Sequence, residues 1–89
     1  MRLSILVEVE WGFEEGSVDW NWCVENATFV HREACEFILH VGPTGDDAGD
    51  SPYWQYYVGT MRVAGCTDAF IDAYIAAKDL GAERVLFHV

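Results

Sequence analysis

The stretch that decides the fold is residues 67–89, which read TDAFIDAYIAAKDLGAERVLFHV. Thr67 is a preferred N-cap residue, and Asp68 after it places negative charge beside the N–H groups of the first helical turn. Gly81 follows the last periodic residue, where a helix C-cap favours the left-handed conformation. These signals predict a helix over about 67–80.

The predicted helix has one acidic face and one packing face. At about 100° per residue, three carboxylates fall within an arc of about 40°: Asp68, Asp72 and Asp79. Ile75 projects into this acidic arc. The opposite side contains the residues expected to pack, which are Phe70, Ala73, Tyr74, Ala77 and Leu80. Residues 83–89 then alternate, which predicts a strand with Val85, Phe87 and Val89 on one face.

Four earlier segments also alternate between apolar and polar residues and predict strands: 2–11, 19–25, 33–42 and 53–64. Residues 12–16 predict a turn that joins the first two strands as an antiparallel pair. The segment 26–41 also fits a helix, and the short apolar run at its end favours a strand there. Residues 42–52 are rich in Gly, Pro and Asp and predict a hairpin loop.

The element order β-β-β-β-α-β predicts a single α+β domain over residues 1–89, because a chain of this length holds one core. We expect a mainly antiparallel sheet of four or five strands, with the helix packed on one face. The Trp residues at 20 and 22 are most simply core residues. The other expected core residues are Leu3, Ile5, Val7, Val9, Phe37, Leu39, Phe70, Ala73, Tyr74, Ala77, Val85 and Phe87.

Composition restricts the class of protein. The apolar fraction of 52% excludes intrinsic disorder. No apolar run reaches the roughly 18 residues of a membrane span, and the start of the chain lacks the basic region of a signal peptide. We therefore expect a soluble cytoplasmic protein.

The three cysteines predict neither disulfides nor a metal site. Cys23, Cys35 and Cys66 are odd in number and include no C-x-x-C pair, so reduced and mostly buried thiols are expected. Cys23, His31 and Cys35 have a spacing that matches no usual zinc motif. The aspartates of 42–52 lack the ladder of a calcium loop. No metal or cofactor is expected.

No catalytic motif is present. The chain has no G-x-S-x-G sequence, and a Cys35 thiol beside a histidine has no supporting motif. Paired carboxylates are too abundant to indicate acid–base catalysis. We therefore expect a protein that is not an enzyme.

The charge balance favours a basic protein partner. Fifteen acidic residues oppose five Lys and Arg, for a formal charge of -10. Direct nucleic-acid binding is disfavoured, because so few cations cannot neutralise several phosphates. A basic protein surface is the natural complement of such charge. Two alternatives remain open: an origin in a high-salt cytoplasm, and an ordinary solvated surface.

The function hypothesis is an acidic inhibitor or decoy that presents carboxylates and rings to a basic, nucleic-acid-binding cleft. Glu8 and Glu10 lie on one face of their predicted strand at a spacing of about 6.5–7 Å, which is comparable to successive phosphates. In size and charge the chain resembles phage anti-CRISPR and anti-restriction proteins, which act in the host cytoplasm, and also toxin-immunity proteins. The alternatives are such an immunity protein or adaptor, or a small enzyme. The candidate partner-binding residues are Glu8, Glu10, Glu14, Glu15, Asp46, Asp47, Asp50, Asp68, Asp72, Asp79, Trp54 and Tyr56.

Overall fold

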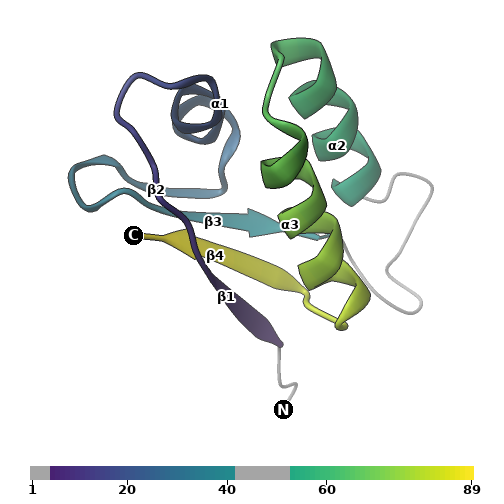
Figure 1. Ribbon diagram of the computed structural model, residues 1–89. Coiled ribbons are helices and arrows are strands. Elements are labelled where there is room, and N and C mark those ends of the chain that lie inside the picture. The colour runs from purple at the N-terminus through teal and green to yellow at the C-terminus, as the bar shows by residue number, and fades with distance from the viewer. Residues whose placement is uncertain (1–4, 42–52) are drawn as a thin grey trace.

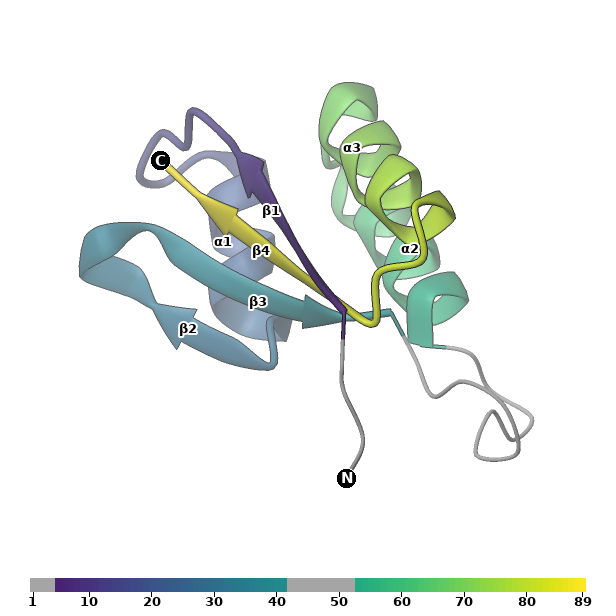
Figure 2. The same ribbon diagram turned by 90° about the horizontal axis from the view of Figure 1, so that it is seen from below.

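A four-stranded sheet carries three helices on one of its faces (Figure 1). The computed structural model describes residues 5–41 and 53–89. Figure 2 shows the two layers from a second direction, with the strands in one layer and the helices in the other. The elements are β1 (Leu6–Glu10), α1 (Val18–Asn26), β2 (Phe29–His31), the 3-10 turn η1 (Arg32–Ala34), β3 (Glu36–His40), α2 (Tyr53–Ala64), α3 (Asp68–Asp79) and β4 (Arg84–His88).

The sheet is mixed, which corrects part of the expected topology. Its strand order is β1-β4-β3-β2. β4 pairs in parallel with β1 and antiparallel with β3, and β2 pairs antiparallel with β3. The α+β class is therefore confirmed. The expectations of a mainly antiparallel sheet and of one helix are wrong in part, because β4 lies between β1 and β3 and two further segments are helical.

α3 and β4 form where the sequence predicts them. The Thr67 side chain accepts a hydrogen bond from the Phe70 N–H at 3.3 Å, and Gly81 has a φ of +94° at the C-terminal end. The packing face is rotated slightly from the expected one. Leu80 is 75% exposed, whereas Ile71 is buried, because α3 packs against both the sheet and α2.

The predicted strand at 19–25 is wrong, because this segment is helix α1. Ser17 caps the helix by accepting a hydrogen bond from the Trp20 N–H. The alternation that suggested a strand arises because the broad buried face of α1 includes both Trp20 and Trp22, which are two residues apart. Trp20 lies under the guanidinium of Arg32, whose carbon is 5.8 Å from the ring, while Trp22 meets the ring of Tyr57 on α2.

The predicted strand at 53–64 is also wrong, because this segment is helix α2. Its inward residues recur at helical spacing: Trp54, Tyr57, Val58 and Met61. Aromatic and β-branched residues are enriched in strands, but this preference is weak and packing overrides it. Here the inward stripe packs beside α1 and α3, which a flat strand could not do.

The remaining strands agree with the sequence in part. β3 confirms the strand expected over 33–42, and β2 adds a short antiparallel partner before it. The turn between them contains Cys35 in a left-handed conformation, with a φ of 53°. β1 occupies 6–10 of the strand expected over 2–11. The turn expected at 12–16 leads into helix α1, so the expected antiparallel pair of the first two strands is wrong, and β1 pairs in parallel with β4. The hairpin loop expected at 42–52 lies outside the described residues.

The core lies between the sheet and the helices. The expected core residues Phe37, Leu39, Phe70, Tyr74, Ala77, Val85 and Phe87 are buried, as are the Trp residues 20 and 22, and Val7, Val9 and Ala73 pack against them. Ile5 is 52% exposed, because it precedes β1 and lies outside the helix-covered part of the sheet. Leu3 lies outside the described residues. In the described ranges, no helix is long and apolar enough to cross a membrane.

Asp19 joins α1 to the start of α3. Its carboxylate accepts hydrogen bonds from the Thr67 N–H at 2.9 Å and from the Thr67 hydroxyl at 2.8 Å. Asp19 is the buried carboxylate of the described residues. Asp19 therefore contributes to the packing of the helices and not to the acidic surface.

We predict that Asp19→Ala lowers the free energy of unfolding by about 2–3 kcal/mol, because it removes the charged acceptor of two hydrogen bonds that Thr67 donates. Urea denaturation followed by tryptophan fluorescence measures the change. Asp72→Ala on the exposed side of α3 is the control and should change stability by less than about 0.5 kcal/mol. Equal effects of the two variants would show that the Asp19 bonds do not hold the helices together.

Candidate interaction surfaces

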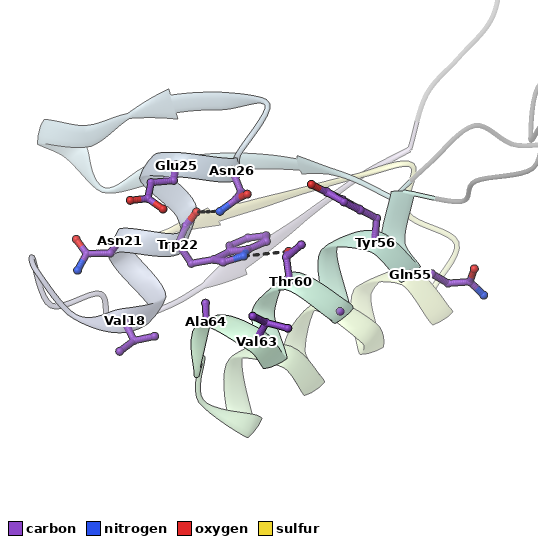
Figure 3. Close-up of a pocket in the computed structure, with 11 residues that line it drawn as sticks. Val18, Asn21, Trp22, Glu25, Asn26, Gln55, Tyr56, Thr60, Val63 and Ala64 are labelled. Carbon is purple, nitrogen blue, oxygen red and sulfur yellow. Dashed lines mark hydrogen bonds between the residues drawn. The ribbon is translucent and has the colours of Figure 1, made fainter.

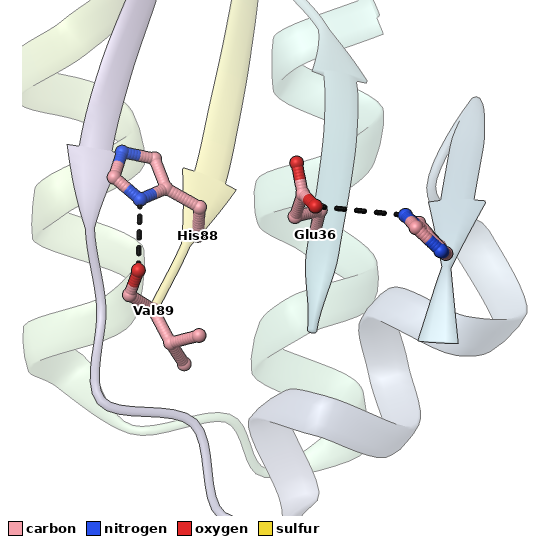
Figure 4. Close-up of polar contacts among 4 residues, drawn as sticks. Glu36, His88 and Val89 are labelled. Carbon is pink, nitrogen blue, oxygen red and sulfur yellow. Dashed lines mark hydrogen bonds and ion pairs between the residues drawn. The ribbon is translucent and has the colours of Figure 1, made fainter. Parts of the chain in front are cut away.

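The sheet face opposite the helices has no covering element among the described residues. Along β3 and β4 the side chains on this bare face alternate with buried ones, and along β1 they alternate with half-buried ones, whereas all three residues of β2 are exposed. Figure 4 shows Glu36 and His88 on neighbouring strands, with the helices behind the sheet. The bare face is formed by Leu6, Glu8, Glu10, Phe29, His31, Glu36, Ile38, His40, Arg84, Leu86 and His88.

Strand register arranges the bare face in rows. An apolar row runs from Leu86 on β4 through Ile38 on β3 to Phe29 on β2, with Glu8 at its β1 end. A second row alternates carboxylates and imidazoles. Glu10 lies opposite His88, and Glu36 on β3 lies opposite His31, with Nδ1 of His31 3.5 Å from Oε1 of Glu36 (Figure 4).

The structure places the predicted carboxylates in more than one region. Glu8 and Glu10 share the bare face, as their spacing predicts. The α3 residues Asp68, Asp72 and Asp79 are exposed in the helix layer, on the other side of the sheet. Glu14 and Glu15 are exposed in the turn before α1, and Asp46, Asp47 and Asp50 lie outside the described residues. The described carboxylates therefore do not form one continuous patch.

Most of these carboxylates have no cationic neighbour. Within 5–41 and 53–89, ion pairs join Lys78 to Asp79 at 2.8 Å and His31 to Glu36. Arg32 packs over Trp20 instead of meeting a carboxylate. The exposed carboxylates without an ion pair in these ranges are Glu8, Glu10, Glu14, Glu15, Glu25, Glu33, Asp68 and Asp72.

The two predicted ring anchors differ in exposure. Trp54 is half-buried against the core, and the ammonium of Lys78 lies 4.2 Å from the centre of its ring. Tyr56 is 64% exposed on α2. Only Tyr56 therefore has the surface position of an anchor, and Trp54 contributes mainly to packing.

A groove of about 670 Å³ lies between α1 and α2 (Figure 3). The Trp22 indole N–H donates to the Thr60 hydroxyl at 3.1 Å across its floor, which fixes the two helices side by side. Each wall is one stripe of a helix at the spacing i, i+3, i+4, i+7. The lining residues are Val18, Asn21, Trp22, Glu25 and Asn26 from α1 and Gln55, Tyr56, Gly59, Thr60, Val63 and Ala64 from α2.

The sequence prediction missed this groove except for Tyr56. Both walls lie in segments predicted as strands, and on a strand their residues would alternate between two faces. The signal that could have found them is the Gly16-Ser17 pair, because a serine before the apolar run is a helix N-cap. Val63 is the most exposed large apolar residue of the described chain, at 91%.

The cysteines are free, as expected, and two of them are buried. Burial raises the pKa of the Cys23 thiol, and the neighbouring Cys66 and Asp19 raise it further. Burial, with the charge and hydrogen bond of Asp19, raises the pKa of Cys66 to about 12. Burial also raises the pKa of Tyr74, whose hydroxyl donates to the His40 carbonyl. These thiols are poor nucleophiles at neutral pH, because the thiolate is the reactive form.

The described residues contain no group of three or more His, Cys, Asp or Glu side chains placed to hold a metal ion. The Cys23, His31 and Cys35 combination considered from the sequence is therefore not assembled.

Comparison of the chain with protein-family models, with curated proteins and with solved structures finds no match.

We predict that the free energy of unfolding falls as pH rises above about 9, the ordinary pKa of a thiol. A group whose pKa is raised by folding stabilises the fold fully below its unfolded pKa, and this contribution is lost as pH rises toward the folded value. Each thiol that ionises only on unfolding contributes about 1.4 kcal/mol per pH unit. Urea denaturation at pH 7–10 measures the slope. The Cys23→Ala/Cys66→Ala variant should have a shallower slope, and an equal slope would contradict this assignment.

We predict that Gly59→Ala raises the free energy of unfolding by about 0.5–1 kcal/mol. Glycine is unfavourable inside a helix, and a Cβ at Gly59 would meet no atom within 4 Å. Thermal or urea denaturation tests this. Gly81→Ala is the contrasting variant and should destabilise, because Gly81 has a positive φ. A loss of stability in Gly59→Ala would mean that the fold itself requires this glycine.

Proposed function

We propose that this protein is a non-enzymatic acidic inhibitor that binds a basic, nucleic-acid-binding surface of a partner protein. The observation that carries the proposal is the set of exposed carboxylates without cationic partners on the described surface. Their mutual repulsion opposes the folding of a small domain. A basic partner would attract these carboxylates. The charge would then stabilise the complex, although it destabilises the isolated protein.

Nucleic-acid mimicry is the finer part of the proposal. Glu8 and Glu10 project side by side from β1 at a spacing comparable to that of phosphates. Their face continues across the sheet to Glu36, so carboxylates occur along a width of several strands. Phage anti-CRISPR and anti-restriction proteins are the corresponding class, and a member of it would act in the host cytoplasm.

A toxin-immunity protein or other adaptor is the second candidate. The observation in its favour is the apolar row of Leu86, Ile38 and Phe29 between the charged rows of the bare face. A pure phosphate mimic has no need of this row. A specific protein partner could bury it, since interface cores are apolar and their rims are polar.

We predict that the immobilised protein retains basic proteins from its native host at about 0.1 M salt and releases them at about 0.5 M, because screening weakens contacts between exposed charges. The matched control is Glu8→Gln/Glu10→Gln, which removes two charges and keeps the size of both side chains. It should retain the same proteins with an affinity reduced at least several-fold. Mass spectrometry identifies the bound proteins, and titration calorimetry measures their affinity.

Equal retention by the wild type and by the Gln variant would contradict a role for these carboxylates. Duplex DNA then separates the two candidates. If DNA displaces the protein from its partner, both bind the same surface and the inhibitor is supported. If a saturating amount of DNA displaces nothing, the mimicry proposal is wrong and the adaptor remains.

A further inference from the structure

We propose that the groove between α1 and α2 binds an amphipathic helix of the partner, with an apolar ridge flanked by Lys or Arg. This inference rests on the proposed function, because it names a docking surface for the same basic partner. The groove presents apolar side chains from both helices, Val18 and Trp22 on α1 and Tyr56, Val63 and Ala64 on α2, as grooves that bind an amphipathic helix do. Figure 3 shows Tyr56, Val63 and Val18 around the Trp22–Thr60 bridge.

Exposure along the groove indicates a broad ligand. Val63 is almost fully exposed, and Tyr56 and Val18 are also among the exposed large apolar residues. Apolar side chains that are this exposed around the groove favour a ligand broad enough to cover them together. A helix laid along the groove would cover all three, because an α-helix has a diameter of about 10 Å with its side chains. Apolar contact would then come from these residues above the buried Trp22.

Gly59 provides a second, independent observation. It lies between Tyr56 and Val63 on the α2 wall. It has a helical backbone, and space for a Cβ is open, so the fold does not require glycine there. Helix interiors disfavour glycine by about 1 kcal/mol relative to alanine. Glycine at this position would allow the backbone of another helix to approach α2 closely, as small residues do where helices cross.

The negative charge of the groove and of the whole chain favours a basic partner over a second copy of this protein. Glu25 lines the groove, and Glu14 and Glu15 precede the α1 wall; none of the three has an ion pair among the described residues. Two copies would bring together chains of formal charge -10 each. Lys or Arg beside the apolar ridge of a partner helix would instead lie next to Glu25. Arg62 is the cation nearest in sequence, and it does not line the groove.

The test uses a synthetic amphipathic peptide of Leu and Lys, roughly 14 residues long so that it can form a helix. A scrambled peptide of the same composition tests attraction by charge alone. Nitrogen-15 NMR of the full chain maps binding, and the indole N–H of Trp22 reports directly on the groove. We expect shifts concentrated at Trp22, Gly59 and Val63, and a weaker response to the scrambled peptide.

Two pairs of variants give the affinities. Gly59→Leu fills the groove and should weaken peptide binding at least tenfold, and Gly59→Ala, which adds one methyl group at the same point, should weaken it by a smaller factor. Val63→Ser should weaken binding severalfold. Leu80→Ser removes another highly exposed aliphatic residue, which lies outside the groove, and should have no effect. Circular dichroism confirms that each variant is folded.

Three outcomes would overturn the inference. Shifts confined to the bare sheet face, with Gly59→Leu binding normally, would reject the groove while leaving an acidic protein that binds basic partners. Groove shifts that grow with protein concentration alone would assign the groove to a second copy. Equal binding of the ordered and scrambled peptides would show that charge alone attracts the ligand. Failure of the Glu8 and Glu10 variant to affect host-protein capture would instead count against the proposed function.

Discussion

The position of the Phe70 ring is the constraint on which the rest of the structure depends. Its centre lies 4.7 Å from that of Phe87 on β4, 5.5 Å from Trp11 after β1 and 6.2 Å from Trp22 on α1. One residue of α3 thus meets the sheet and another helix. The Thr67 cap fixes where α3 begins, and the Asp19 bonds to Thr67 set α1 beside that point. Aromatic pairs at these distances add to the free energy of burial.

Because all three helices pack around the rings that contact Phe70, two surfaces are not covered by any of the described elements. One is the bare sheet face, with an apolar row between charged rows. The other is the groove, where the outer stripes of α1 and α2 face solvent. The described carboxylates are distributed over both layers, and most of those exposed there have no ion pair within residues 5–41 and 53–89. The proposed partner therefore need not cover one acidic patch, and charge can attract it while apolar contact fixes its orientation.

The sequence predicted those parts of the fold that carry local end signals. Thr67 and Gly81 delimit α3, and the alternation of β1 correctly predicted that Glu8 and Glu10 share a face. The segments of α1 and α2 were assigned as strands for a physical reason. The buried face of α1 is broad enough to include both Trp20 and Trp22, so two large apolar residues stand two positions apart as they would in a strand. The groove could not be predicted without these helices, and the role of Asp19 depends on a contact 48 residues away.

The central claim is that the surplus negative charge opposes the fold and is kept for a partner. The most direct measurement is the free energy of unfolding of the isolated protein as salt rises from about 0.01 to 0.3 M, over which the Debye length shortens several-fold. If the exposed carboxylates repel one another without compensation, stability rises over this range. If stability falls instead, ion pairs within the chain stabilise the fold, and the claim is contradicted.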